Sequence, residues 1–176
     1  DEPKYGLAVV GTVHPQGVAA VCRFLPFAPP DDPQLIVVLH EVRDPGNAGT
    51  ILRTADAAGA DAVYFTGDSV DPYNGKCVRS TAGSLFHIPF TSCALSDVPM
   101  DGLQVLATSG AGERDLREVD LGLPTAWVFG NEAHGLPDHS RIEQRTIGRD
   151  ADDDIGAGRR HCAGIAIEHV VLGAAM

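Results

Sequence analysis

The fold is decided by residues 37–55, which read VVLHEVRDPGNAGTILRTA. The apolar run from Leu35 to Leu39 has the length and composition of a buried strand in a parallel sheet. The turn residues of Asp44-Pro45-Gly46 follow it, and apolar residues then recur at helical spacing from Ile51 to Ala55. The stretch therefore predicts a strand, a polar loop and a helix, and we expect Asn47 to be the N-cap of that helix.

Three further apolar runs extend this unit into an α/β domain. Residues 61–67, 103–108 and 125–129 are short and rich in β-branched or aromatic residues, and the first follows directly after the predicted helix. A strand, a helix and a second strand in this order form a right-handed crossover between parallel strands. We therefore predict a mostly parallel sheet flanked by helices. We also expect a strand over 85–90, a short helix over 74–84 and a final helix over 163–175.

The composition indicates an ordinary globular protein. The chain has 176 residues, of which 44% are hydrophobic and 21% are charged, so one domain with a substantial core is expected. No apolar run reaches the roughly 18 residues that a membrane span requires. The cysteines are far apart and form no C-x-x-C pair, which favours scattered buried thiols over zinc ligands or disulfides; they are Cys22, Cys77, Cys93 and Cys162.

The net charge is strongly negative. The sequence carries 13 basic and 24 acidic residues, which gives a formal charge of −11 and repels nucleic acid at long range. A nucleic-acid enzyme with this charge must concentrate its basic residues at the site or take its RNA affinity from a second domain.

A second loop matches the first one in position. Residues 130–137 read GNEAHGLP and follow the predicted strand at 125–129. Gly130 and Gly135 permit close approach of the main chain and positive φ angles, which a ligand-gripping loop needs. Because open α/β sheets bind ligands at the carboxyl ends of their strands, the two loops are expected to meet there.

Together the two loops carry a family resemblance. Asn47-x-Gly49-x-x-x-Arg53 combined with Gly130-Asn131-Glu132-x-x-Gly135-Leu136-Pro137 resembles the motifs of the SpoU/TrmH family of RNA ribose 2′-O-methyltransferases, within the SPOUT superfamily. The likeness runs over about residues 6–137. It implies a C-terminal trefoil knot, S-adenosylmethionine as cofactor, a cytoplasmic homodimer and 2′-O-methylation of a ribose in structured RNA, ribosomal RNA more than transfer RNA.

The resemblance also implies roles for individual residues. Arg53 would lie beside the reacting ribose and stabilise the developing alkoxide, because a guanidinium is a poor base. Asn47 and Glu132 would orient Arg53 or the substrate. The cofactor would be held largely by main-chain groups, and the residues are Thr108, Ser109, Gly110, Gly130, Asn131, Glu132, Gly135 and Ile147.

RNA contacts are expected from Arg43, Lys76 and Arg79, of which the last two are one helical turn apart. No metal is expected. His134 and His139 lie near the second loop, but two histidines without a third ligand do not make a metal site.

The resemblance divides the chain into two parts. Residues 1–33 are expected to be an N-terminal segment and linker that follow an RNA-binding domain, because Thr12-Val13-His14-Pro15-Gln16-Gly17 is similar to the family's junction between the two domains. Residues 34–176 are expected to form the methyltransferase domain.

The C-terminal part departs from the family pattern. Arg160-His161-Cys162 stand where the family carries Ser-Leu-Asn before its last helix. This departure leaves open a catalytically inactive RNA-binding or ribosome-assembly protein on the same fold, beside a transfer RNA 2′-O-methyltransferase. A class I methyltransferase with its donor at residues 109–113 is a third interpretation, but Gly110-Ala111-Gly112 lacks the third glycine of the usual loop.

Overall fold

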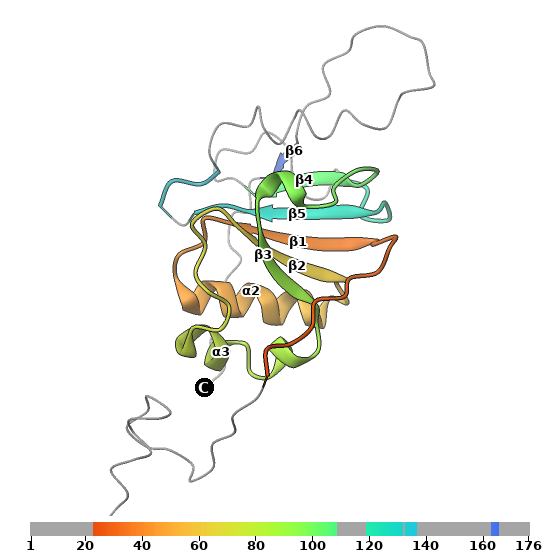
Figure 1. Cartoon of the computed structure of the whole chain (residues 1–176). Coiled ribbons are helices and arrows are strands. Elements are labelled where there is room, and N and C mark those ends of the chain that lie inside the picture. The colour runs from red at the N-terminus through yellow and green to blue at the C-terminus, as the bar shows by residue number, and fades with distance from the viewer. Residues whose placement is uncertain (1–22, 109–118, 132, 137–162, 166–176) are drawn as a thin grey trace, which may run out of the picture.

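The computed structural model describes residues 23–108, 119–131, 133–136 and 163–165. They form a six-stranded sheet in the order β3-β2-β1-β5-β4-β6, in which every paired strand is parallel (Figure 1). The strands are β1 (Leu35–His40), β2 (Ala62–Thr66), β3 (Phe90–Cys93), β4 (Gln104–Thr108), β5 (Thr125–Phe129) and β6 (Ala163–Ile165). The helices are α2 (Pro45–Ala57) and α3 (Gly75–Ser80), with 3₁₀ turns η1 (Ser84–Phe86) and η2 (Leu95–Asp97). The predicted fold class, a parallel sheet flanked by helices, is confirmed.

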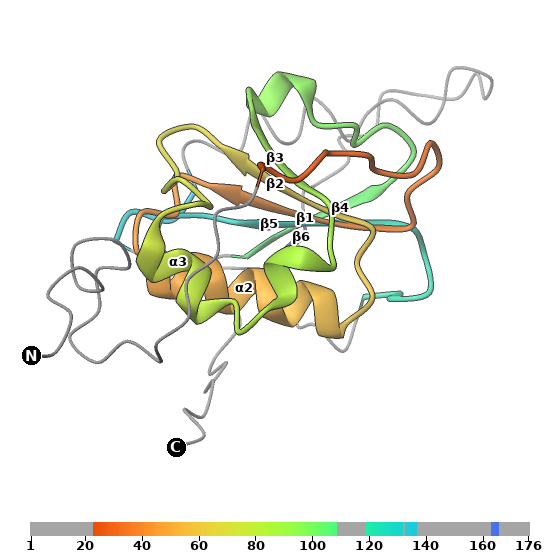
Figure 2. The same ribbon diagram turned by 60° about the horizontal axis from the view of Figure 1, so that its bottom comes forward.

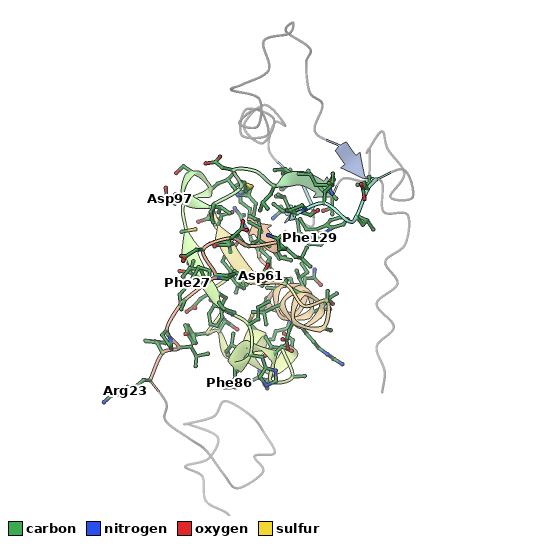
Figure 3. The ribbon with its side chains drawn as sticks, turned by 90° about the vertical axis from the view of Figure 1, so that its right-hand side faces the viewer. Arg23, Phe27, Asp61, Phe86, Asp97 and Phe129 are labelled. Carbon is green, nitrogen blue, oxygen red and sulfur yellow. The ribbon has the colours of Figure 1, made fainter. Side chains whose placement is uncertain are left out.

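Both faces of the sheet are buried, which explains why its central strands are almost entirely apolar. In β1, Val37 and Leu39 pack into the cluster formed with α2 and α3, whereas Ile36 and Val38 pack into a second cluster on the other face. Figure 2 shows the two helices below the sheet and the segment that contains η2 above it. Phe86 of η1 and Asp97 of η2 accordingly lie on opposite sides in Figure 3.

The strand order brings the two predicted loops together. From β1 the chain builds outward through β2 to β3, while β5 and β4 lie on the other side of β1. β1 therefore pairs with β2 and with β5, and the carboxyl ends of β1 and β5 are neighbours. The strand order thus reverses direction between β1 and β5, and open α/β sheets leave a crevice for a ligand at such a reversal.

Helix α2 begins earlier than predicted. Asp44, not Asn47, is the N-cap: its side chain accepts a hydrogen bond of 2.9 Å from the main-chain amide of Asn47. Pro45 then occupies the first helical turn, where its fixed φ suits the helix and its missing N–H is not needed. The expectation of an Asn47 cap is wrong because Pro45 moves the start of the helix three residues back.

Three other elements also differ from the expectation. Residues 85–90 are not one strand, because η1 occupies Ser84–Phe86 and β3 begins at Phe90. The helix expected over 74–84 is shorter, since Asn74 caps it and α3 ends at Ser80. The helix expected from Ala163 is wrong at its start, where Ala163–Ile165 pair with the open edge of β4 as β6.

The segment before β1 is anchored to both faces of the sheet. The main-chain amide of Leu25 donates a hydrogen bond of 3.0 Å to the Tyr73 hydroxyl, on the helical side. Phe27 packs edge-on against Tyr64 on the opposite face, with 5.6 Å between ring centroids, and Arg23 projects away from the body of the domain (Figure 3). In the described ranges, no helix has both the length and the apolar character needed to cross a membrane.

Candidate active site

The candidate site is built from the loops that leave β1 and β5 at the carboxyl edge of the sheet. A direct hydrogen bond joins the two loops: the Nδ2 of Asn131 donates to the carbonyl oxygen of Glu41 over 2.9 Å. These residues are 90 positions apart in the sequence. The structure therefore brings the two motif-bearing loops together, as the sequence predicted.

The loop after β5 is closed by its own main chain. Asn131 and Gly135 exchange two backbone hydrogen bonds, of 2.9 Å and 2.8 Å, and Gly135 has a φ of +67°. A Cβ atom on Gly130 would lie 2.5 Å from the carbonyl carbon of Gly135 and 2.7 Å from the amide nitrogen of Leu136. Gly130 is thus required by the closure of the loop itself.

The Asn131 side chain is turned into the protein. Asn131 is 8% exposed, and its Oδ1 accepts hydrogen bonds from the amides of Ala133 (2.9 Å) and His134 (3.1 Å). Ala133 and His134 themselves are exposed. Because the Asn131 carboxamide is turned inward and Gly130 and Gly135 have no side chain, the main chain at these positions is available for recognition of a ligand by backbone groups.

The end of β4 lies beside this loop. Thr108 is half-buried, and its hydroxyl donates a hydrogen bond of 3.2 Å to the carbonyl oxygen of Val128 in β5. That bond fixes the last residue of β4 against β5. Thr108 therefore lies at the carboxyl edge of the sheet, beside the second loop, where the sequence predicted a cofactor contact.

Arg53 lies on α2, away from the carboxyl edge. It is the ninth residue of a helix that starts at Pro45, so it lies about 12 Å along the helix axis from that start. Arg53 is exposed, and within the described part of the chain its side chain forms no hydrogen bond or ion pair. Asn47 and Arg53 are separated by about 9 Å of helix rise and a third of a turn, so they are not joined directly on this helix.

Two of the predicted RNA-binding residues are paired with carboxylates. Arg43 contacts Asp68 over 3.4 Å, and Lys76 contacts Asp44 over 3.2 Å. The pKa of Asp44 is lowered below its usual value, first by the hydrogen bond from the Asn47 amide and then by Lys76. Arg79, the third predicted contact, is exposed near the end of α3.

Helices α2 and α3 are locked together by a residue that the sequence analysis did not single out. The Ser80 hydroxyl is within hydrogen-bonding distance of the carbonyl oxygens of Pro45 (3.0 Å) and Cys77 (2.8 Å). A Cβ atom on Gly49 would collide with this hydroxyl and would lie 2.7 Å from the Cys77 carbonyl oxygen. Gly49 of the first motif is therefore required by the packing of α2 on α3. A small residue on α3 facing Gly49, such as Ser80, is the signal in the sequence that corresponds to this contact.

Glu41 is the second residue that sequence reasoning missed. Its φ is +57°, a left-handed conformation that is uncommon outside glycine. Its amide donates to the carbonyl oxygen of Thr66 over 3.0 Å, and its carbonyl oxygen is the one that Asn131 binds. Nothing in the sequence around Glu41 marks this conformation.

The remaining predicted site residues lie outside the described residues; they are Ser109, Gly110, Glu132 and Ile147. The same holds for the unusual Arg160-His161-Cys162 and for the segment that would form a knot. Among the described residues, no group of three or more His, Cys, Asp or Glu side chains could hold a metal ion.

A pocket of about 370 Å³ lies near the amino ends of β1 and β5, with Leu121, Leu123 and Trp127 in its lining. This is the opposite end of the sheet from the two loops, so the pocket is not part of the candidate site.

Comparison with known proteins supports the loop motifs. Residues 34–146 match the family model described as the SpoU rRNA Methylase family. The chain is 37% identical over 133 residues to a 23S rRNA (guanosine(2553)-2′-O)-methyltransferase of Bacillus subtilis, covering 73% of this chain and 53% of that protein. It is 39% identical over 135 residues to an uncharacterized tRNA/rRNA methyltransferase of Synechocystis, covering 73% of this chain and 49% of that protein.

A solved structure shows the same fold. The AdoMet-bound rRNA methyltransferase of Sinorhizobium meliloti has a TM-score of 0.60 and 36% identity, covering 81% of this chain and 57% of that one. The chain thus spans about half the length of these relatives. By its matched family model and by the two loops that meet at the edge of its sheet, the chain belongs to the SpoU rRNA methylase family.

Proposed function

We propose that this chain is the catalytic domain of an S-adenosylmethionine-dependent RNA methyltransferase that methylates a ribose 2′-hydroxyl, with ribosomal RNA as its substrate. The observation that carries the proposal is the hydrogen bond between Asn131 and Glu41, which joins the family's two motif loops at the reversal point of the sheet. Membership of the SpoU family supplies the reaction class. Its relatives are described as 23S rRNA and tRNA/rRNA methyltransferases.

The residues of the second loop fit the proposed cofactor. Among the described residues, no heavy atom beyond its chain neighbours lies within 4 Å of a Cβ built on Gly135, so these residues leave open space beside its main chain. The main chain of Gly135 borders that space without a side chain in the way, which suits a nucleoside recognised by its edges. Gly130, Gly135 and Thr108 would hold the cofactor, together with Ser109, Gly110, Glu132 and Ile147. When bound, the cofactor supplies an electrophilic methyl group on a sulfonium.

The protein's part in the reaction is positioning and charge stabilisation. The 2′-oxygen must be held in line with the methyl group at about 3 Å, and such positioning can supply several kcal/mol of the barrier. As the hydroxyl loses its proton, negative charge develops on the oxygen. A guanidinium keeps its positive charge at neutral pH, so Arg53 stabilises the oxyanion and leaves proton removal to solvent or another base.

The position of Arg53 favours a site that is completed by a second subunit. Its side chain is exposed and lies about two turns along α2 from the carboxyl edge. A homodimer, which the family resemblance implies, would let the Arg53 of one chain reach a ribose bound at the loops of the other. We also propose the family's C-terminal trefoil knot and a cytoplasmic location for this dimer.

RNA would be held chiefly by cations that are not already neutralised. Arg79 is exposed and has no carboxylate partner among the described residues, so we assign it the main phosphate contact. Arg43 and Lys76 would have to exchange Asp68 and Asp44 for phosphate, so their contribution is smaller. With a net charge of −11, the chain would also depend on an N-terminal RNA-binding domain joined through residues 1–33.

The proposal is tested by calorimetric titration of S-adenosylmethionine and by transfer of labelled methyl groups to in vitro transcripts of ribosomal and transfer RNA. Arg53→Ala is expected to abolish transfer and to leave donor affinity near that of the parent chain. Arg23→Ala removes another exposed arginine, on the segment before β1, and serves as the control, with transfer unchanged. Loss of donor binding together with transfer in Arg53→Ala would mean that Arg53 is structural.

Two results would favour other functions. Transfer to transfer RNA alone would identify a tRNA methyltransferase. Absence of both donor heat and methyl transfer, with RNA still bound, would identify an inactive RNA-binding protein on this fold, as the unusual Arg160-His161-Cys162 would then suggest.

A further inference from the structure

Both polar atoms of the Asn131 carboxamide form hydrogen bonds within the protein. Its Oδ1 accepts two amide hydrogen bonds inside its own loop, and its Nδ2 donates to the Glu41 carbonyl oxygen. Its main-chain N–H and C=O are both paired with Gly135. Asn131 is 8% exposed, and a cofactor bound through its carboxamide oxygen would have to displace one of these hydrogen bonds, which leaves only the second Nδ2 hydrogen for a ligand.

The group that Asn131 binds is held in an unfavourable backbone conformation. A non-glycine residue in the left-handed region carries a cost, because its Cβ approaches the following carbonyl oxygen. At Glu41, with φ at +57°, this conformation is fixed from two sides: the amide by Thr66 of β2 and the carbonyl oxygen by Asn131 after β5. The chain leaves β1 in a set direction as a result.

That direction determines where α2 begins. Val42, which follows Glu41, is 1% exposed and packs into the core beneath α2. Asp44 lies two residues further on and caps α2, the helix that carries Asn47 and Arg53. A change in the peptide that leaves Glu41 would therefore move the first motif relative to the second.

We propose that Asn131 is a positioning residue for methyl transfer: its carboxamide holds the exit of β1, and through it α2, in the position from which Arg53 reaches the reacting ribose. The inference rests on the proposed function and assigns Asn131 a role other than donor contact by its side chain. It predicts an effect on the rate of transfer at saturating donor and little effect on donor affinity.

Asn131→Ser is the main test. A serine hydroxyl can still accept a hydrogen bond from the turn amides, as in an ST-turn, but it cannot donate to Glu41 in place of the longer carboxamide. Because a misplacement of about 1 Å costs on the order of 100-fold in rate, we expect kcat to fall by about that factor. Donor affinity should stay within about threefold of the parent chain, since the groups proposed to hold the donor remain in place.

Asn131→Asp is the second variant. It keeps the acceptor oxygen but sets a carboxylate oxygen against the Glu41 carbonyl oxygen at the present 2.9 Å. We expect a larger loss of kcat than in Asn131→Ser. Adding Glu41→Gly should recover part of the rate, because glycine tolerates the positive φ and lets the peptide turn away from the new charge.

Gln104→Glu is the matched control. The Gln104 side chain also donates from its amide to a main-chain carbonyl oxygen, that of Asp120 at 2.7 Å, but at the amino end of β4. The same chemical change there should reduce stability and leave kcat unchanged. Hydrogen exchange of the peptide spanning residues 41–48 gives an independent readout: it should quicken in Asn131→Ser and not in Gln104→Glu.

The outcomes are separable. No transfer by the parent chain would overturn the proposed function. Hydrogen exchange of residues 41–48 in Asn131→Ser would still show whether Asn131 holds the exit of β1. An active parent with full kcat in Asn131→Ser would overturn this inference. A folded Asn131→Ser that loses donor binding and transfer together would make Asn131 a ligand contact, and unfolding of both variants would make it a requirement of the fold alone.

Discussion

Replacement of Gly130 by alanine tests whether the second loop must close as observed in order to bind the donor. The new Cβ would lie 2.5 Å from the carbonyl carbon of Gly135, whereas ordinary contacts begin at 3.4 Å, so the 135–136 peptide must move by 0.9 Å. The atoms in the way are all backbone, so no side-chain rotation relieves the overlap. Overpacking of this kind costs about 1–3 kcal/mol.

The same displacement weakens the two backbone hydrogen bonds between Asn131 and Gly135. If the loop opens to relieve the overlap, donor binding requires the loop to close again, and the free energy of the overlap is then subtracted from the binding free energy. A penalty of about 1–3 kcal/mol corresponds to roughly 5- to 150-fold weaker donor binding. We therefore expect Gly130→Ala to remain folded and to bind S-adenosylmethionine at least about fivefold more weakly.

Calorimetric titration at 25 °C, together with urea unfolding of the same samples, measures both effects. Gly122→Ala is the control, because its new Cβ would meet only the Asp120 carboxylate, at 3.2 Å, on a side chain that can rotate. The Gly122 variant should bind the donor normally. Gly130→Ala with the donor affinity of the parent chain would refute the reasoning and would remove this loop from the site.

Three further predictions concern stability and reactivity. Ala82 has a φ of +49° and is exposed, so Ala82→Gly should raise the free energy of unfolding by up to about 1 kcal/mol in urea titration; a loss would show that its Cβ is needed. Because the pKa of Asp44 is lowered in the folded state, its charge stabilises the fold above about pH 4 and this contribution is lost as the pH falls through the folded-state pKa. Asp44→Asn can still cap α2, so the stability advantage of the parent over this variant should be present at pH 7 and stay below about 1 kcal/mol for this exposed pair. The advantage should disappear once the pH lies below the folded-state pKa, and a constant difference would contradict this. Burial raises the pKa of the Cys77 thiol to about 11, so iodoacetamide at pH 8 should modify Cys77 only after unfolding, and rapid labelling of the native chain would argue against its burial.

The strands of the central sheet could be predicted because both faces of the sheet are covered. The runs at 35–39, 62–66, 104–108 and 125–129 are apolar or β-branched over nearly their whole length, and each lies within or near a predicted strand. The meeting of the two motif loops followed from the parallel order of these strands. Two regular signals, apolar run and turn chemistry, were sufficient for that part of the fold.

The parts of the fold that could not be predicted depend on contacts with other residues that the local sequence does not reveal. Asp44 and Asn47 are both good N-cap residues, and Pro45 decides between them only once its place in the first turn is known. The run from Ala163 is apolar enough for a helix or a strand, and pairing with the free edge of β4 makes its first three residues a strand. The φ of Glu41 and its bond to Asn131 are set by a partner 90 residues away.

The candidate site shows the same division. The sequence predicted that Gly130, Gly135 and Thr108 would share one edge of the sheet, and the described residues place them there. It also expected Asn47 to orient Arg53 or the substrate, and on α2 the two residues are six positions apart, about 9 Å of rise and a third of a turn, so their side chains do not meet on this helix. Their separation follows from helical spacing alone, because both residues lie in the same helix.

The most direct test of the central claim is a crystal structure of the chain with S-adenosylmethionine and an RNA fragment. The account predicts that the donor lies against the main chain of Gly130–Gly135 and the end of β4, with an Arg53 guanidinium within hydrogen-bonding distance of the target 2′-oxygen. A donor bound in the pocket beside Leu121 and Trp127, or a reacting ribose that no Arg53 approaches, would contradict it.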